Sequence, residues 1–243
     1  MKIEGRNSVA EAIKAGKTID RLVVAKDMKD AGANRIIADA KSRGIKIMFY
    51  DKAVLDRESV TKRHQGFIAE ITDFKYCEID DILRNAEDKN EPPFILVIDG
   101  VDDPHNLGSI LRVADCAGCH GVIIPRHRNV TVNETVVKVS AGAANNVLVA
   151  KVTNINDAIE RLKKENIWVY ACELGGQDVY STNLKGACAF VIGGEGSGVG
   201  KLTKQKCDAI VTLPMRGQVN SLNASVASGI IAFEYVRQNQ NAN

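Results

Sequence analysis

The 243-residue sequence lacks several features that define whole classes of protein. No apolar run approaches the roughly 20 residues that span a membrane, and the N-terminal residues lack the apolar core of a signal peptide. We therefore expect a cytoplasmic protein. The 6 cysteines are scattered along the chain, which in this context indicates reduced thiols rather than a disulfide framework.

Motifs for metals and phosphates are also missing. Cys116 and Cys119 form a CxxC pair that could be a metal half-site or a redox pair, but no second Cys or His pair with zinc spacing follows. The pair ends an apolar helix-like stretch, where cysteine behaves as a small hydrophobe, so we favour a structural role. No His or acidic cluster has ligand spacing, and we expect no metal.

A glycine-rich stretch, Gly193–Gly200, follows a predicted strand and raises the possibility of a pyrophosphate cradle. Its glycines do not give the GxGxxG spacing, and no Lys-Ser or Lys-Thr follows to make a P-loop. The stretch also follows a late strand rather than the first one, where the dinucleotide fingerprint lies. We therefore disfavour a nicotinamide enzyme and consider a flexible surface loop or a cradle for an uncharged nucleoside instead.

The formal net charge of +2 conceals an asymmetry. Residues 1–75 hold 16 Lys and Arg against 11 Asp and Glu, whereas residues 76–243 hold 16 against 19. A basic front portion is typical of a domain that contacts a polyanion, although an ordinary solvated domain has a similar charge.

The pattern of apolar residues predicts an α/β protein of two domains. Residues 1–75 should form a small α/β domain, in which Ile3–Ile13 begins with a turn and continues as a helix. Residues 76–93 are acidic and polar and end in Pro92-Pro93, so we predict chiefly a linker with a short helical patch. Residues 94–243 alternate helix-like segments with six β-prone runs, which predicts a parallel sheet covered on both faces. The runs are 94–98, 121–124, 146–150, 167–171, 187–192 and 209–213.

The last run leads into Leu213–Gly229, which holds a Pro- and Gly-bearing loop and the start of an apolar helix. Asn220 or Ser221 is expected to cap this helix. An ordinary strand–loop–helix joint would explain one capping residue, but the helix entrance also carries Asn223 and Ser225. This crowding of polar side chains favours a binding site.

Three stretches carry a family resemblance: the Asn-Leu-Gly-Ser-Ile-Leu-Arg of Asn106–Arg112, the Gly-Glu-Gly of Gly194–Gly196, and the Ser-Leu-Asn of Ser221–Asn223. In order and spacing they resemble the three signature motifs of the SpoU (TrmH) family of RNA 2′-O-ribose methyltransferases. The N-terminal segments Ile3–Val9 and Thr61–Gly66 resemble the L30e-like RNA-binding domain of the bacterial 23S ribosomal RNA guanosine-2′-O-methyltransferases in this family.

The resemblance implies S-adenosylmethionine as the cofactor, a trefoil-knotted SPOUT domain at residues 94–243, and a homodimer that completes the active site. The cofactor site it implies comprises Gly193, Gly194, Glu195, Gly196, Leu213, Met215, Ser221, Leu222 and Asn223. The catalytic residues it implies are Asn106, Arg112, Glu195, Ser221 and Asn223. Residues 1–75 would bind RNA, with Arg6, Asn7, Lys62, Arg63 and His64 as candidate contacts.

Arg112 is the most informative of these residues. A guanidinium keeps its proton at ordinary pH, so we expect it to bind the phosphate beside the target ribose rather than act as a general base. A structural salt bridge to Asp103 or Glu195 is the alternative. His105 is the other titratable candidate, although a histidine at a helix entrance is more often a surface residue.

The function expected from the resemblance is 2′-O-methylation of a ribose in structured RNA, with a guanosine of 23S ribosomal RNA as the specific target. The alternatives are a tRNA ribose methyltransferase and an RNA-binding module without catalysis. The intact Asn106, Arg112, Glu195 and Asn223 argue against the second alternative. Asn220, where the family leads us to expect serine, and Ala224, where valine is usual, weaken the substrate assignment more than the reaction.

Overall fold

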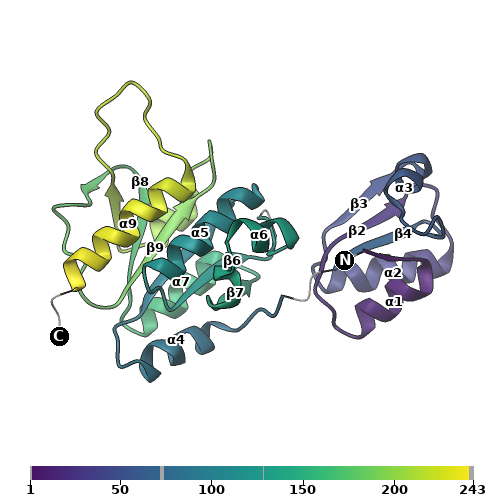
Figure 1. Ribbon diagram of the computed structural model, residues 1–243, viewed down its shortest axis with the longest axis horizontal. Coiled ribbons are helices and arrows are strands. Elements are labelled where there is room, and N and C mark those ends of the chain that lie inside the picture. The colour runs from purple at the N-terminus through teal and green to yellow at the C-terminus, as the bar shows by residue number, and fades with distance from the viewer. Residues whose placement is uncertain (1, 72–73, 128, 241–243) are drawn as a thin grey trace. The chain divides into compact units, whose positions relative to one another are not determined.

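The structure is a computed structural model that describes residues 2–71, 74–127 and 129–240. The chain divides into two compact units, Met1–Lys75 and Tyr76–Asn243 (Figure 1). Each unit has its own sheet with its own covering helices, so the predicted α/β class is confirmed.

The first unit is built on a four-stranded mixed sheet. Its elements are β1 (Lys2–Glu4), α1 (Arg6–Lys14), β2 (Ile19–Ala25), α2 (Ala31–Ser42), β3 (Ile47–Tyr50), α3 (Lys52–Glu58) and β4 (Phe67–Ile71). The strand order is β1-β4-β2-β3, with β2 and β3 parallel and the other pairs antiparallel. Side chains alternate between the two faces of a strand, so Leu22 and Val24 pack with α1 and α2, whereas Val23 and Ala25 pack with Leu55 of α3.

Strand β1 was not predicted, because its residues were assigned to a turn. Ile3 pairs with Ala69 of β4 in an antiparallel ladder. The chain then turns at Gly5, whose φ of 94° favours glycine, and enters α1 directly. A three-residue strand whose partner lies far along the chain leaves little pattern in its own sequence.

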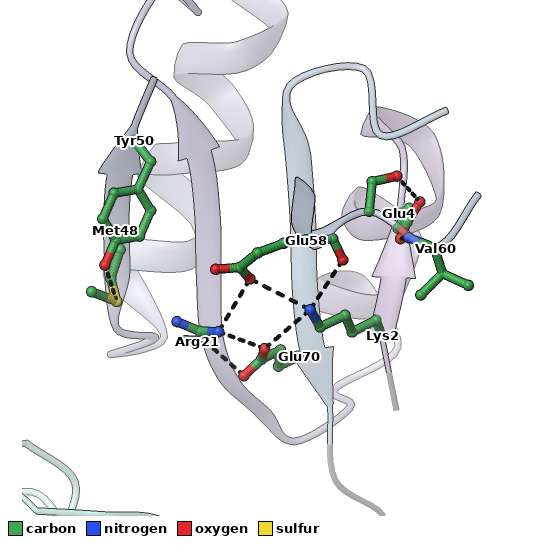
Figure 2. Close-up of polar contacts among 9 residues, drawn as sticks. Lys2, Glu4, Arg21, Met48, Tyr50, Glu58, Val60 and Glu70 are labelled. Carbon is green, nitrogen blue, oxygen red and sulfur yellow. Dashed lines mark hydrogen bonds and ion pairs between the residues drawn. The ribbon is translucent and has the colours of Figure 1, made fainter. Parts of the chain in front are cut away.

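Lys2, Arg21, Glu58 and Glu70, from β1, β2, α3 and β4, form a network of ion pairs, which Figure 2 shows. Arg21 binds both carboxylate oxygens of Glu70 at 2.7 Å and reaches Glu58 at 3.2 Å. Lys2 lies 3.4 Å from the carboxylate of Glu58. The hydrogen bond from Arg21 lowers the pKa of Glu70 against the opposing effect of burial. These two cations are therefore paired within the unit, and its excess positive charge comes from other residues.

The second unit is built on a six-stranded parallel sheet of order β10-β8-β9-β5-β6-β7. Its elements are α4 (Ile79–Asp88), β5 (Phe94–Asp99), α5 (Pro104–Cys116), β6 (Gly121–Pro125), α6 (Glu134–Val139), the 3₁₀ helix η1 (Ala143–Asn145), β7 (Val149–Val152), α7 (Ile155–Lys164), β8 (Trp168–Asp178), β9 (Cys188–Gly193), α8 (Lys201–Lys206), β10 (Ala209–Thr212) and α9 (Ala224–Asn239). The predicted parallel sheet is confirmed. Strand β9, late in the chain, pairs with β5, the first strand of this sheet, and β8 pairs with the other side of β9. The three strands are parallel, so the loops that follow them lie at one edge of the sheet.

Helices cover both faces of this sheet. Ile82 of α4 and Ile159 and Leu162 of α7 pack on one face, in a cluster with Ile95 and Val97 of β5. On the other face, the ring of Phe94 stacks on Tyr235 of α9 with centroids 4.0 Å apart. The strands are thus buried on both sides, as their continuous apolar runs require.

Residues 76–93 are part of the second unit rather than a linker. Cys77 pairs with the β7 residue Ala150, and Ile82 of α4 is fully buried in the sheet's core. A Cβ at Gly121 would lie 2.5 Å from Ile82, so this glycine makes room for the helix. The buried His120 accepts a hydrogen bond from the backbone N–H of Phe94, and burial lowers its pKa. The polar composition that suggested a linker belongs to the exposed side of α4.

The cysteines of the CxxC pair differ in environment. Cys116 is exposed at the end of α5, whereas Cys119 is buried, and burial raises the pKa of its thiol well above the ordinary value. In the described ranges, no group of three or more His, Cys, Asp or Glu side chains could hold a metal ion. None of the helices described here is long and apolar enough to cross a membrane.

Candidate active site

The loop after β9 is held in a tight conformation that only glycines allow. Gly198 donates a backbone hydrogen bond to Gly194 at 3.0 Å and has a φ of 61°. A Cβ at Gly193 would lie 2.1 Å from the backbone of Gly198, and one at Gly194 would lie 2.0 Å from the carbonyl oxygen of Gly100. Larger residues would push this loop away from the end of β5.

The entrance of α5 presents the first polar side chain of the site. Asp103 caps the helix by accepting the backbone N–H of His105 at 2.9 Å, and Pro104 occupies its first turn. Asn106 follows in the same turn and is only 5% exposed. Its side chain donates to the carboxylate of Glu195, in the loop after β9, at 3.0 Å.

The N-terminus of α9 presents the second polar side chain of the site, that of Asn223. Asn223 is its N-cap: the side-chain oxygen accepts the backbone N–H groups of Ser225 and Val226. We expected Asn220 or Ser221 in this role; both are exposed and lie outside the helix, which begins at Ala224. The cap is the residue nearest the first helical turn, and the preceding polar residues belong to the loop.

The three motifs meet in one hydrogen-bonded cluster of Asn106, Glu195 and Asn223. The amide nitrogen of Asn223 donates to Asn106 at 2.8 Å and to the Glu195 carboxylate at 2.6 Å. The amide nitrogen of Asn106 donates to the same carboxylate oxygen. Each amide oxygen and nitrogen has a compatible partner, so the cluster holds Glu195 in one orientation. A carboxylate fixed by two amides is suited to orient a donor such as a hydroxyl group.

A cavity of about 660 Å³ lies against this cluster, within the range of small-molecule sites. Every residue predicted for the cofactor site lines it: Gly193, Gly194, Glu195, Gly196, Leu213, Met215, Ser221, Leu222 and Asn223. Ile192 and Ile231 add apolar surface. The cavity thus combines apolar walls, close main-chain approach and a few polar side chains, as recognition of a nucleoside requires.

Comparison with known proteins assigns both units. Residues 93–233 match the SpoU rRNA Methylase family, and residues 2–77 match the RNA 2′-O ribose methyltransferase substrate binding family. The chain belongs to the SpoU methylase family. The predictions of this family and of an RNA methyltransferase are therefore confirmed.

Individual SpoU relatives match between about two thirds and nearly all of this chain. YacO of Bacillus subtilis (strain 168), provisionally named a TrmH family tRNA/rRNA methyltransferase, is 42% identical over 236 residues, which cover 96% of this chain and 94% of YacO. The structure of an AdoMet-bound rRNA methyltransferase from Sinorhizobium meliloti is similar with a TM-score of 0.60, 24% identity and coverage of 97% of this chain and 86% of its own. The A. aeolicus TrmH/SpoU tRNA modifying enzyme is similar with a TM-score of 0.57 and 24% identity, and covers 68% of this chain and 85% of its own.

Within this SpoU fold, Arg112 stands apart from the cluster. It is exposed on α5, six residues after Asn106, which places it about 120° around the helix from that side chain. It does not line the cavity. Among the described residues, the structure shows no salt bridge from Arg112 to Asp103 or Glu195, so that alternative finds no support.

Glu173 is a cavity residue that the sequence analysis missed. The register of β8 against β10 shifts, because Ile210 pairs with Ala171 and the next residue, Val211, pairs with Gln177. Glu173 therefore lies in a β-bulge, and it lines the cavity. Its carboxylate accepts the backbone N–H of Val199 at 2.9 Å, and its carbonyl oxygen accepts the Thr212 hydroxyl. A charged residue just past an apolar strand is the only signal in the sequence, and this strand was predicted to end at residue 171.

The RNA-contact candidates of the first unit differ in accessibility. Asn7, Lys62 and Arg63 are exposed. Arg6 makes a two-pronged ion pair with Asp30, at 2.9 and 2.7 Å, so its guanidinium is already engaged. Asn7, Lys62 and Arg63 thus remain exposed candidates, although the ammonium of Lys62 donates to the carbonyl oxygen of Asp56.

His64 is not a surface residue, contrary to expectation. It is 3% exposed, and its Nδ1 accepts the backbone N–H of Gly66 at 3.0 Å. The proton therefore lies on Nε2, which donates to Asp56 at 2.9 Å. This hydrogen bond lowers the pKa of Asp56. His64 shapes the loop, because both ring nitrogens are occupied within it.

The same loop is fastened by Glu4. Its carboxylate accepts the Ser59 hydroxyl at 2.7 Å, the backbone N–H groups of Val60 and Thr61 at 2.6 and 3.1 Å, and the Thr61 hydroxyl. Burial raises the pKa of Glu4, but these hydrogen bonds outweigh it and lower the pKa to about 2. The exposed Lys62 and Arg63 thus stand on a loop with a fixed backbone.

Proposed function

We propose that this protein transfers a methyl group from S-adenosylmethionine to the 2′-hydroxyl of a ribose in structured RNA, with a guanosine of 23S ribosomal RNA as the target. The observation that carries the proposal is the Asn106–Glu195–Asn223 cluster at the edge of a nucleoside-sized cavity. The family match supports the reaction class.

The residues around the cavity fit the cofactor. Leu213, Met215 and Leu222 supply apolar walls for an adenine, and the Gly193–Gly198 loop supplies main-chain groups at close range. The glycine spacing lacks a phosphate motif, in keeping with a nucleoside that carries no phosphate. When bound, S-adenosylmethionine supplies an electrophilic methyl group on a sulfonium. Glu195, held by the two amides, would then orient the incoming ribose hydroxyl.

Arg112 has a separate role in the proposal. Exposed and outside the cavity, it is free to bind the RNA phosphate next to the target ribose. Its position around α5 also keeps it from the cluster of its own chain, as described above. We therefore propose that a homodimer completes the active site, with Arg112 facing the site of the second copy.

The exposed side of α9 supports such a dimer. This helix buries Ala224, Ile231 and Tyr235 against its own unit. On the opposite side of the helix, Val226 and Phe233 are 49% and 50% exposed. Helix α5 packs beside α9, so Arg112 and this apolar surface belong to one helical layer. A second copy would remove the apolar side chains from water. Sedimentation equilibrium should give a dimer, and Phe233→Glu should give a monomer.

The first unit is proposed to bind the RNA. It matches a substrate-binding family model, and the Sinorhizobium meliloti rRNA enzyme aligns with nearly the whole chain, whereas the A. aeolicus tRNA enzyme aligns with about two thirds of it. This difference favours ribosomal RNA. Removing both charges in Lys62→Ala/Arg63→Ala should weaken RNA binding and lower the slope of log affinity against log salt by about 1.5 to 2. Binding that keeps its salt slope would remove this loop from the RNA interface.

The decisive experiment is transfer of a labelled methyl group from S-adenosylmethionine to total RNA, followed by mapping of the methylated ribose. Purified ribosomal and transfer RNA fractions are assayed in parallel, with Asn223→Ala as the inactive control. Label at a guanosine of 23S ribosomal RNA is expected. Label only in tRNA would change the proposed substrate from ribosomal RNA to tRNA, and absence of transfer to any RNA would refute the proposed methyl transfer.

The proposal includes the trefoil knot of the family and a cytoplasmic location. The knot rests on the resemblance to the family, because a sheet order in which late strands return beside the first one also occurs in unknotted doubly wound sheets. Pulling the chain by its two ends should then give a contour length shorter than the roughly 3.3–3.6 Å per residue of an open chain.

A further inference from the structure

Three charged side chains line the cofactor cavity: Glu173, Glu195 and Lys204. They come from the bulge of β8, from the loop after β9 and from α8. The formal charge of this lining is therefore −1. Among the described residues that line the cavity, Lys204 is the only cation.

The two carboxylates are compensated differently. Glu195 accepts hydrogen bonds from the neutral amides of Asn106 and Asn223, which leave its charge in place. Glu173 faces the ammonium of Lys204 at 3.7 Å, an ion pair longer than a hydrogen bond, and both side chains remain partly exposed. The lining charge can thus be changed at this pair without touching the Asn106–Glu195–Asn223 cluster.

Glu173 also has a purely structural contact, which must be separated from its charge. Its carboxylate accepts the backbone N–H of Val199 and so fastens the glycine loop. A Cβ at Gly198 would lie 2.2 Å from this carboxylate, which shows how closely the loop is packed on it. Glutamine at position 173 removes the charge and keeps an oxygen for the Val199 N–H, but it gives up the second acceptor oxygen, which the carboxylate offers to the backbone N–H of Leu174 at 3.2 Å.

We propose that the net charge of Glu173, Glu195 and Lys204 sets the preference of this cavity for cationic S-adenosylmethionine over its neutral product, S-adenosylhomocysteine. The inference rests on the proposed function. The two ligands differ by one methyl group and by one positive charge on sulfur. A change in lining charge therefore alters the affinity for the first ligand more than for the second, since a fixed charge acts on the sulfonium through a partly desolvated cavity.

The two members of the pair make opposite predictions. Glu173→Gln changes the lining charge from −1 to 0, so it should raise the Kd for S-adenosylmethionine by about fivefold to tenfold, and change that for S-adenosylhomocysteine by less than about twofold. Lys204→Gln changes the charge to −2 and should shift the ratio of the two Kd values the other way. The double variant returns the charge to −1 and should restore the wild-type ratio.

The test is calorimetric titration of the full-length protein and the three variants with each ligand, without RNA. Circular dichroism and thermal melting serve as controls for folding. If Glu173→Gln lowers the affinity for both ligands equally, the residue only holds the glycine loop in place and the inference is overturned. A ratio of the two Kd values that stays the same in every variant would also overturn it. Failure of the wild-type protein to bind either ligand would instead refute the proposed function.

Discussion

Replacing Asn223 by alanine should lower both stability and activity, and the structure allows the two effects to be separated. Loss of the side-chain cap of α9 costs about 1 kcal/mol. The side chain also donates to the Glu195 carboxylate and to Asn106. Hydrogen bonds to charged groups contribute about 1.5–3 kcal/mol when buried, but Asn223 is exposed, so we take about 1 kcal/mol for both bonds.

The alanine variant should therefore lose about 2 kcal/mol, which lowers the Tm of a unit of this size by about 4–8 °C. Asn223→Ser is the matched control, because a serine hydroxyl also caps a helix but is too short to replace the amide donors. We expect it to lose about half as much in Tm and to lose methyl transfer as fully as the alanine variant.

The assays are scanning calorimetry of the full chain and labelled methyl transfer to its RNA substrate. Equal Tm values for the alanine and serine variants would show that the cap contributes nothing to stability. A serine variant with wild-type transfer would refute the view that the amide of Asn223 orients Glu195 for the reaction.

Three further predictions concern other parts of the chain. Arg112→Ala should keep cofactor affinity in calorimetry but lose transfer, and wild-type turnover would remove Arg112 from the mechanism. Gly108→Ala should cost about 1–3 kcal/mol in a thermal melt, because its Cβ would lie 2.8 Å from that of Val139; an unchanged Tm would mean that α6 can shift without cost. The pKa of Glu4 is lowered from 4.5 to about 2. It therefore contributes stability above pH 4.5 that is lost as pH falls from 4.5 to 2, about 1–2 kcal/mol after solvent screening. Glu4→Gln should flatten this part of the first unit's pH–stability curve, and an unchanged slope there would contradict the assignment.

Several features of the fold could be predicted because their cause is local. The apolar runs that became β5 and β9 are buried on both faces, and such strands need continuous apolar sequence wherever they occur in a sheet. The residues that line the cavity were expected from the family resemblance, which three short motifs carry. Such motifs are readable in the sequence because glycines and capping side chains are required where a backbone turns sharply and enters a helix.

Other features depend on partners that are distant in sequence. Strand β1 exists because β4 offers an edge for pairing. Helix α4 packs on the sheet although its segment is mostly polar, because Ile82 is buried in the space that Gly121 leaves by having no side chain. His64 was expected on the surface with its basic neighbours. It is buried instead, because its two ring nitrogens form hydrogen bonds with Asp56 and with the backbone of Gly66.

The sequence by itself determined the central strands of the second unit's sheet, where the glycine loop lies, and which family the chain resembles, because these depend on residues that are neighbours in the chain. Only the tertiary structure decided that Asn223 rather than Asn220 caps α9, that Glu173 enters the cavity, and that Arg112 points away from the cluster. Each of these depends on the register of a strand or the rotation of a helix. Such geometry is set when whole elements pack together, so no single segment of the sequence records it.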